Sequence, residues 1–259
     1  MAETLVKQDP AAPDGFFQSE AAGLRWLAEA MDAGGARVVA VIDVAPGRIE
    51  IERVRAGRAT AQAAHAFGAA LARTHDAGAA AFGAPPAGWS GPGFIGKRPQ
   101  PYAHEQSWGA FYARDRVLPF LAIAQEAGSV TDAEARGIRE ACELIASGAF
   151  DDDEPPARIH GDLWNGNLLW DERGGILIDP AAHGGHRETD LAMLELFGAP
   201  HLDEIVAGYE SAHPLRAGRD DRIPLHQLHP LAVHAAGYGR GYGVELAAAA
   251  RAVLALTPH

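Results

Sequence analysis

The sequence has little cysteine, a deficit of positive charge and no long hydrophobic run. Its 259 residues include one cysteine, Cys142, which excludes an intramolecular disulfide and a cysteine cluster for zinc or iron–sulfur. Lys and Arg number 22 against 34 Asp and Glu, a net charge of −12, which disfavours binding to nucleic acid or to an anionic membrane. No charge-free stretch of about 18 apolar residues and no apolar core of a secretory signal occur. We therefore expect a cytoplasmic protein without nucleic-acid or membrane partners.

The composition is otherwise that of an ordinary globular protein. Hydrophobic residues make up 47% of the chain and charged residues 22%, and the length suits one or two domains. In the first quarter, short β-branched runs alternate with one helical pattern, and a Pro-Gly pair at 46–47 marks a hairpin turn. We expect strands over Thr4–Lys7, Val38–Val44 and Arg48–Val54, and a helix over Phe17–Met31.

From residue 59 onward the pattern becomes mainly helical. A Pro/Gly-rich connector covers residues 84–101. The G-x-G-x-x-G within it, from Gly91 to Gly96, is interrupted by a proline and follows no strand, so we do not expect it to bind a nucleotide. Thr131 and Glu134 have the spacing of a capping box. We expect helices over Ala61–Asp76 and Glu105–Ala127, and strands over Arg158–His160, Leu168–Trp170 and Ile176–Ile178.

These patterns predict an α+β fold in two unequal parts. Residues 1–56 form a small part of antiparallel strands and one helix, and residues 57–259 form a larger, mostly helical part. No internal repeat and no charge run marks a protein partner, so we expect a monomer.

The segment from 159 to 197 carries the chemistry. His160-Gly161-Asp162 is followed by Asn167 and, after a predicted hairpin, by Asp179, which is the H-x-D-x-x-x-x-N spacing of the catalytic loop in kinase-fold phosphotransferases. A carboxylate at Asp162 can orient a hydroxyl and accept its proton. Asn167 and Asp179 supply the oxygen ligands that Mg²⁺ prefers. We expect His160 to order the loop rather than to act as a base.

Each piece of this pattern has an ordinary structural interpretation by itself. A lone His-Gly-Asp is usually a turn, and Asp-Pro is usually a strand end; the joint order and spacing favour a phosphotransferase. A metal hydrolase is disfavoured, because the 12 histidines are scattered. His226 and His229 lie three apart on a predicted helix, where packing is the more common role.

The motifs resemble those of one family. HGDLWNGN and the later DPAAHGGHRETDLAMLELFG resemble the fructosamine (ketosamine) 3-kinase family, which is related to aminoglycoside phosphotransferases. FGAALARTH, GFIG, WGAFYARDR and LHQLHPLAVHAAGYGRGY extend the resemblance over nearly the whole chain. It implies a protein-kinase-like fold of two lobes, a truncated small N-terminal lobe (1–56) and a helical C-terminal lobe (57–259), and the use of ATP and Mg²⁺.

The resemblance also implies roles in the small lobe. Lys7 ends the strand whose lysine holds the α- and β-phosphates, and Glu20 on the next helix pairs with it. The family has two further strands and a glycine-rich phosphate loop before this lysine, whereas six residues precede Lys7 here. A hinge that meets adenine, mostly through backbone groups, is implied at Glu52, Arg53 and Val54.

The implied activity is ATP-dependent phosphorylation of the 3-hydroxyl of a ketosamine, on a free or protein amine, which leads to deglycation. Asp162 is then the catalytic residue and Asn167 and Asp179 hold the metal. Trp164, His186 and Glu188 are substrate candidates beside the loop, with core packing and helix capping as equal alternatives. Two alternative functions are a kinase of another small hydroxyl acceptor, such as an aminoglycoside, and a pseudokinase or binding module. The missing glycine-rich loop favours the second, and the intact Asp162, Asn167 and Asp179 oppose it.

Overall fold

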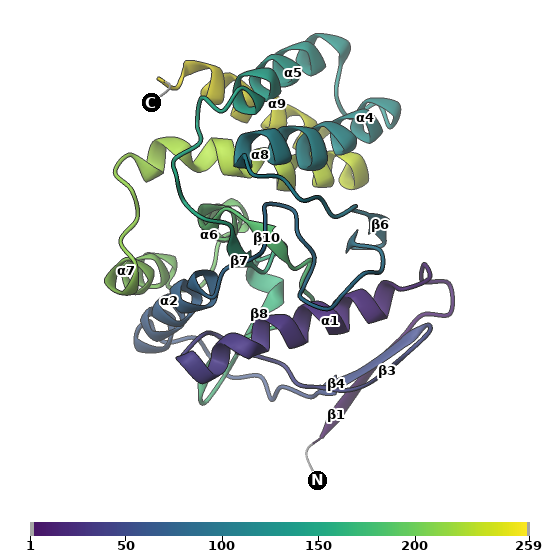
Figure 1. Ribbon diagram of the computed structural model, residues 1–259, viewed down its shortest axis with the longest axis vertical. Helices are drawn as coiled ribbons and strands as arrows, with labels where there is room; N and C mark the ends of the chain where they lie inside the picture. Colours follow the sequence, from purple (N-terminus) through teal and green to yellow (C-terminus); the bar gives the residue numbers. More distant parts are fainter. Residues whose placement is uncertain (1–2, 258–259) are drawn as a thin grey trace.

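The computed structural model describes residues 3–257. Met1 and Ala2, with which the predicted small lobe begins, and Pro258 and His259, with which the large one ends, lie outside the described residues. Figure 1 shows a sheet with one helix, α1 (Phe16–Ala28), at one end and a group of helices at the other, with short strands between them. This arrangement agrees with the predicted α+β class.

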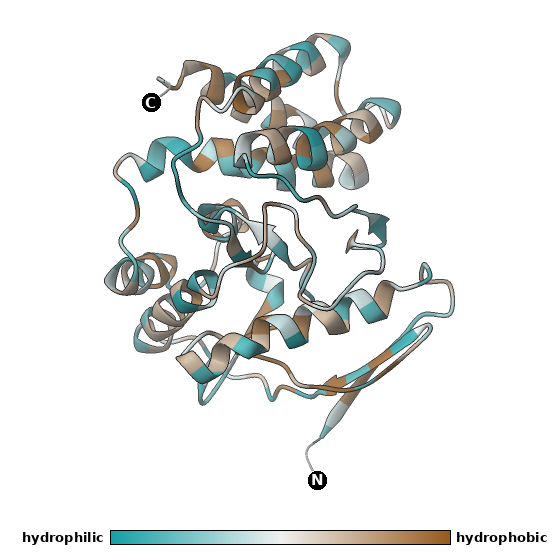
Figure 2. Cartoon of the chain, in the orientation of Figure 1, coloured by the Kyte–Doolittle hydropathy of each residue, from teal (hydrophilic) through white to brown (hydrophobic). Residues whose placement is uncertain are grey.

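The N-terminal sheet carries the predicted lysine strand. Its strands are β1 (Thr4–Gln8), β3 (Val41–Ala45) and β4 (Arg48–Glu52), antiparallel in the order β1-β4-β3. Ile49 and Ile51 are fully buried while Glu50 between them is not, as the two-residue period of a strand requires. Lys7 pairs with Ile49 and so lies on the buried face, toward α1. Figure 2 shows hydrophobic and hydrophilic residues alternating along α1 and these strands.

The prediction of one strand over Val38–Val44 was wrong. The segment splits into β2 (Arg37–Val38) and β3, and β2 joins another sheet, where it runs parallel to β9 (Gly174–Leu177). β9 in turn pairs antiparallel with β8 (Leu168–Asp171). Arg37 binds Asp171 through two hydrogen bonds of 2.7 and 2.9 Å. The β-branched run correctly predicted extended backbone, but a sequence period does not identify the partner strand.

The rest of the chain is mostly helical. The predicted helix over Glu105–Ala127 starts later, at Trp108, and contains a π-helical turn over Tyr112–Val117. The capping box of Thr131 and Glu134 is confirmed. The elements are α2 (Ala61–Asp76), β5 (Phe94–Ile95), β6 (Arg98–Pro99), α3 (Trp108–Phe111), α4 (Leu118–Glu126), α5 (Asp132–Ala146), β7 (Ala157–Ile159), β10 (His183–Gly185), α6 (Arg187–Phe197), α7 (Leu202–Ala212), α8 (Arg219–Tyr238) and α9 (Arg240–Ala255), with 3-10 turns over Glu29–Ala33 and Asn165–Asn167.

Two hydrophobic clusters hold the fold together. One joins α3, α4, α5, α8 and α9, and its single cysteine, Cys142, is buried as a packing residue. The other joins α1 and the N-terminal strands to α2, β8, β9, α6 and α7. This second cluster crosses the predicted boundary at 56/57, which stays a prediction. Within residues 3–257 no helix combines the length and the hydropathy that crossing a membrane would need.

Helices α2 and α7 touch through one glycine each. A Cβ at Gly68 would lie 1.9 Å from the Ile205 carbonyl oxygen, and one at Gly208 would lie 1.9 Å from that of His65. Both contacts are with backbone, so a side chain can be accommodated only if the helices separate. We expect Gly68→Ala to lower the free energy of unfolding by about 2 kcal/mol or more and the melting temperature by roughly 5 °C.

Gly137 on α5 is the matched control, because a Cβ there meets nothing within 4 Å. Alanine is the better helix former, so we expect Gly137→Ala to raise the free energy of unfolding by about 0.5–1 kcal/mol. Denaturant unfolding of both variants checks the pair. Equal effects of the two substitutions would contradict the close-packing argument.

Candidate functional site

The loop after β7 is held by one buried carboxylate. Asp190 on α6 accepts hydrogen bonds from the His160 amide (2.7 Å), the Gly161 amide (2.9 Å) and His75 Nε2 (3.1 Å). Gly161 has a positive φ of 78°, and a Cβ there would lie 2.3 Å from the Ala181 carbonyl oxygen. Only glycine fits this turn. The conformation of the loop is therefore fixed by its own glycine and by a side chain 29 residues later.

His160 has the ordering role expected from the sequence. Its Nδ1 accepts the Asp162 amide at 3.2 Å, and its Nε2 lies 2.8 Å from the Ile178 carbonyl oxygen. Burial lowers the pKa of His160, so the ring stays neutral and can both donate and accept. It thereby joins the loop to the strand end before Asp179.

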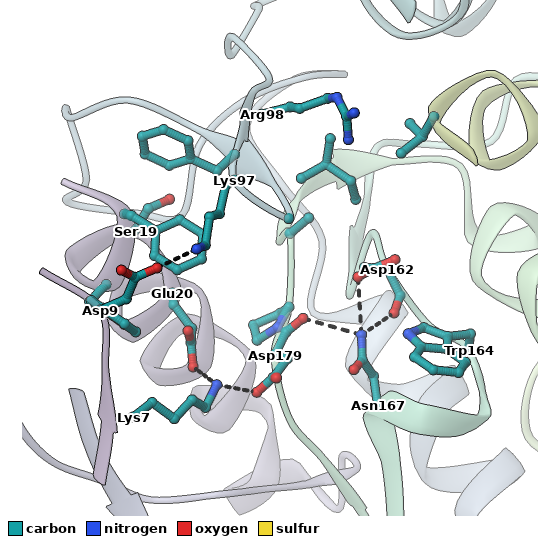
Figure 3. Close-up of a pocket in the computed structure, with 18 of the residues that line it drawn as sticks. Lys7, Asp9, Ser19, Glu20, Lys97, Arg98, Asp162, Trp164, Asn167 and Asp179 are labelled. Atoms are coloured by element: carbon teal, nitrogen blue, oxygen red, sulfur yellow. Dashed lines mark hydrogen bonds and ion pairs between the residues drawn. The ribbon is translucent and has the colours of Figure 1, made fainter. Parts of the chain in front are cut away.

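Asp162, Asn167 and Asp179 meet at one end of a cavity (Figure 3). Asn167 Nδ2 donates to the Asp162 backbone oxygen at 2.8 Å, to Asp162 Oδ2 at 3.1 Å and to the Asp179 backbone oxygen at 3.4 Å. Burial raises the pKa of Asp162 to about 7. A carboxyl with this pKa near neutral pH is suited to accept a proton.

Lys7 joins the small sheet to this cluster. Its Nζ lies 2.5 Å from Glu20 on α1 and also contacts the Asp179 carboxylate. Burial disfavours the ammonium, but the two carboxylates outweigh this effect and raise the pKa of Lys7. An ammonium has three donors, so one remains to bind a phosphate oxygen. The expected pairing of Lys7 with Glu20 is present.

Asp179 has an unusual backbone. Its φ is 53°, in the left-handed region that aspartate tolerates better than most residues. Such outliers cost about 1–3 kcal/mol and are concentrated at functional sites. Here the turn brings the carboxylate to Lys7 while its carbonyl stays near Asn167.

The oxygen atoms of Asn167 and Asp179 are of the kind that Mg²⁺ prefers, and their role as metal ligands stays a prediction. The amide nitrogen of Asn167 makes all the hydrogen bonds described above, which leaves its oxygen available, and the Asp179 side chain is 42% exposed. One amide oxygen and one carboxylate, completed by phosphate and water oxygens, fit Mg²⁺. Within residues 3–257 no group of three or more His, Cys, Asp or Glu side chains is placed so that it could hold a metal ion.

The predicted connector forms a wall of the cavity. The β5–β6 hairpin places Lys97 and Arg98 in the lining of the cavity. Figure 3 shows Lys97 beside Asp9, and Arg98 apart from the labelled carboxylates. Lys97 Nζ contacts Asp9, so it ties this hairpin to the segment after β1. Sequence reasoning missed both residues. The adjacent cations in a Pro/Gly-rich stretch were the available signal.

The substrate candidates separate into two groups. Trp164 lines the cavity and is 41% exposed. His186 and Glu188 are each 3% exposed and lie outside its lining. His186 caps α6 through the Glu188 amide and contacts Asp152, while Glu188 binds Arg222 at 2.6 Å. Their proposed contact with substrate is corrected, because internal partners occupy both side chains.

The hinge candidates lie beside a different hollow. Glu52, Arg53 and Val54 line it together with Asp171 at the tip of the β8–β9 hairpin. The Glu52 amide donates to the Ala40 carbonyl oxygen and the Arg53 amide to that of Glu3. Neither amide can therefore serve adenine without breaking a bond. A backbone role for Val54 stays a prediction.

Comparison with known proteins agrees with this geometry. Residues 2–255 match the sequence model of the family described as "Fructosamine kinase". A protein of Lactiplantibacillus plantarum named as a ketoamine kinase is 31% identical over 241 residues, which cover 92% of this chain and 82% of that protein. The mouse ketosamine-3-kinase is 35% identical over 148 residues, 57% of this chain and 47% of that protein.

Solved structures extend the likeness to the fold. A crystal structure described as a fructosamine-3-kinase of Thermobifida fusca has a TM-score of 0.91 and 43% identity, covering 98% of this chain and 86% of that one. The aminoglycoside phosphotransferase APH(4)-Ia has a TM-score of 0.57 at 15% identity, covering 96% and 86%, and so shares the fold alone. The predicted kinase-like α+β fold is confirmed, and the chain belongs to the fructosamine kinase family.

Proposed function

We propose that this protein transfers the γ-phosphoryl group of ATP to the 3-hydroxyl of a ketosamine. The observation that carries the proposal is the cluster of Asp162, Asn167 and Asp179 with the Lys7–Glu20 pair beside it. Kinase-fold enzymes require this set of groups for positioning and charge stabilisation. The family match supports a ketosamine as the acceptor.

In the proposed reaction Asp162 accepts the proton of the acceptor hydroxyl. A bond forms between the acceptor oxygen and the γ-phosphorus, the bond from that phosphorus to the bridging oxygen breaks, and ADP leaves. Lys7 holds phosphate oxygens on the side opposite the acceptor. Asn167 and Asp179 would hold Mg²⁺, which neutralises phosphate charge when bound. Trp164 offers an aromatic face to the acceptor.

The test is phosphate transfer from ATP to a fructosyl- or ribulosyl-amine in the presence of Mg²⁺, read by product mass. We expect a product heavier by one phosphoryl group. An aminoglycoside and choline belong in the same panel, because transfer to either alone would favour the other small-acceptor function. Failure of transfer to every acceptor, with nucleotide still bound, would favour a binding module. The cytoplasmic location and the monomeric state stay predictions.

A further inference from the structure

Of the three cationic side chains that line the cavity, two form ion pairs with carboxylates and Arg98 does not. Lys7 contacts Glu20 and Asp179, and Lys97 contacts Asp9. Arg98 also lines the cavity, yet among residues 3–257 no carboxylate lies within 4 Å of its guanidinium. A partly buried cation in a binding cavity favours an anionic ligand when, as here, no carboxylate of the described residues forms an ion pair with it.

The guanidinium is held in place by the end of α8. Its Nη2 donates to the Ala236 carbonyl oxygen at 3.2 Å. A Cβ at Gly237 would lie 3.0 Å from Nη1 and 3.1 Å from Nη2, so glycine lets the flat group rest against the helix backbone. The carbonyl end of a helix attracts a cation. The remaining N–H groups of the guanidinium are still available to donate two parallel hydrogen bonds to a carboxylate.

Its position is on the acceptor side of the site. Figure 3 shows Arg98 on the opposite side of the cavity from Lys7, which contacts Asp179. Aromatic rings lead from the catalytic loop toward the same helix end, with centroid distances of 6.1 Å for Trp164–Phe197, 4.7 Å for Phe197–His234 and 5.3 Å for His234–Tyr238. Trp164, His234 and Tyr238 also line the cavity. Asp162, Trp164, His234, Tyr238 and Arg98 line one cavity, so an acceptor with its hydroxyl at Asp162 would extend past these rings toward Arg98.

We propose that Arg98 selects ketosamines whose amine substituent carries a carboxylate, such as the ketosamines of free amino acids. This inference rests on the proposed function and narrows its substrate class. A neutral amine, or a lysine side chain whose α-carboxylate is locked in a peptide bond, presents no such group at this position. Because a hydrogen bond to a charged group contributes more than a neutral one, the preference in kcat/KM is about tenfold or more.

The test compares fructosyl-glycine with fructosyl-glycinamide, which differ in the carboxylate alone. For the unmodified chain we expect kcat/KM to be at least about tenfold higher with fructosyl-glycine. In Arg98→Gln we expect the two values to become equal and the KM for ATP to stay within about twofold. Lys97→Gln removes the same charge from the neighbouring residue, and we expect it to keep the preference. Thermal melting of both variants checks that they fold.

Three results would overturn this proposal while leaving the kinase activity in place. They are equal kcat/KM values in the unmodified chain, a preference that survives in Arg98→Gln, and a large rise in the KM for ATP in that variant, which would assign Arg98 to the nucleotide phosphates. Transfer to neither compound contradicts the proposed function itself, and the selectivity falls with it.

Discussion

Asp162→Asn is expected to lower kcat for phosphoryl transfer by about 10²- to 10⁴-fold. The substitution keeps the shape of the side chain and an oxygen that can accept the hydrogen bond from Asn167, but it removes the group that accepts the proton. Since Asp162 does not contact Lys7 or Glu20, the affinity for ATP should change little. Turnover measured under saturating ATP checks the expected loss of kcat, and nucleotide titration checks the unchanged affinity for ATP.

The same variant has a second expected result, on stability. Burial raises the pKa of Asp162 to about 7, whereas an unfolded aspartate titrates near 3.9. The folded state therefore disfavours the carboxylate. This cost is absent below about pH 4, grows as the pH rises and is complete above about pH 7. With a chelator present, Asp162→Asn should match or exceed the original melting temperature at pH 8, and the difference should vanish at pH 4.

Near-original turnover in Asp162→Asn would contradict the assignment of the proton acceptor. Loss of turnover together with a markedly lower melting temperature at pH 8 would show a structural role instead. The two measurements thus separate a chemical function of Asp162 from a contribution to folding.

Asp179→Ala is expected to abolish the dependence of ATP binding on Mg²⁺ and to reduce turnover by at least about 10²-fold. Asp179 is the carboxylate of the proposed metal pair and also one of the two carboxylates that bind Lys7. Mg²⁺ is usually bound by one or two carboxylates plus phosphate oxygens. Removal of the Asp179 carboxylate therefore leaves the neutral amide of Asn167 as the only proposed protein ligand. Lys7 keeps Glu20 as a partner, so weak binding of ATP should persist.

Nucleotide titration with Mg²⁺ and with a chelator measures this effect directly. The original chain should bind ATP more tightly with Mg²⁺, and the variant should bind equally in both conditions. Asp43→Ala, which removes an exposed carboxylate on β3 with a single ion pair to Arg48, is the matched control and should retain the Mg²⁺ effect. An undiminished Mg²⁺ effect in Asp179→Ala would remove Asp179 from the metal site.

Much of the candidate site could be read from local sequence. The spacing of Asp162, Asn167 and Asp179 follows from one loop and one hairpin, so it needs no distant contact to be recognised. The prediction that His160 orders this loop also holds, because its partners, Asp162 and Ile178, lie within 18 residues. The geometry of a loop whose contacts are close in the sequence can be predicted from the local pattern of residues.

The role of Asp190 could not be predicted from the local sequence. It lies in the DLAM motif, which marks the family resemblance, but its role depends on bonds to His160, Gly161 and His75, up to 115 residues away. Glu188, two residues earlier, was expected at the substrate and is instead buried against Arg222 of α8. The helical period of apolar residues predicts which face of a helix is buried, but not which other helix packs against that face.

The sequence by itself determined the family and the α+β class and identified the candidate catalytic loop, because these depend on residue types at fixed local spacing. Only the tertiary structure decided which distant segments complete the site. It placed β2 beside β9, brought Lys7 and Glu20 to Asp179, and made the β5–β6 hairpin a wall of the cavity with Arg98 against α8. The physical reason is that strand pairing and helix packing are chosen by surface complementarity between segments far apart in the chain, which no local period records.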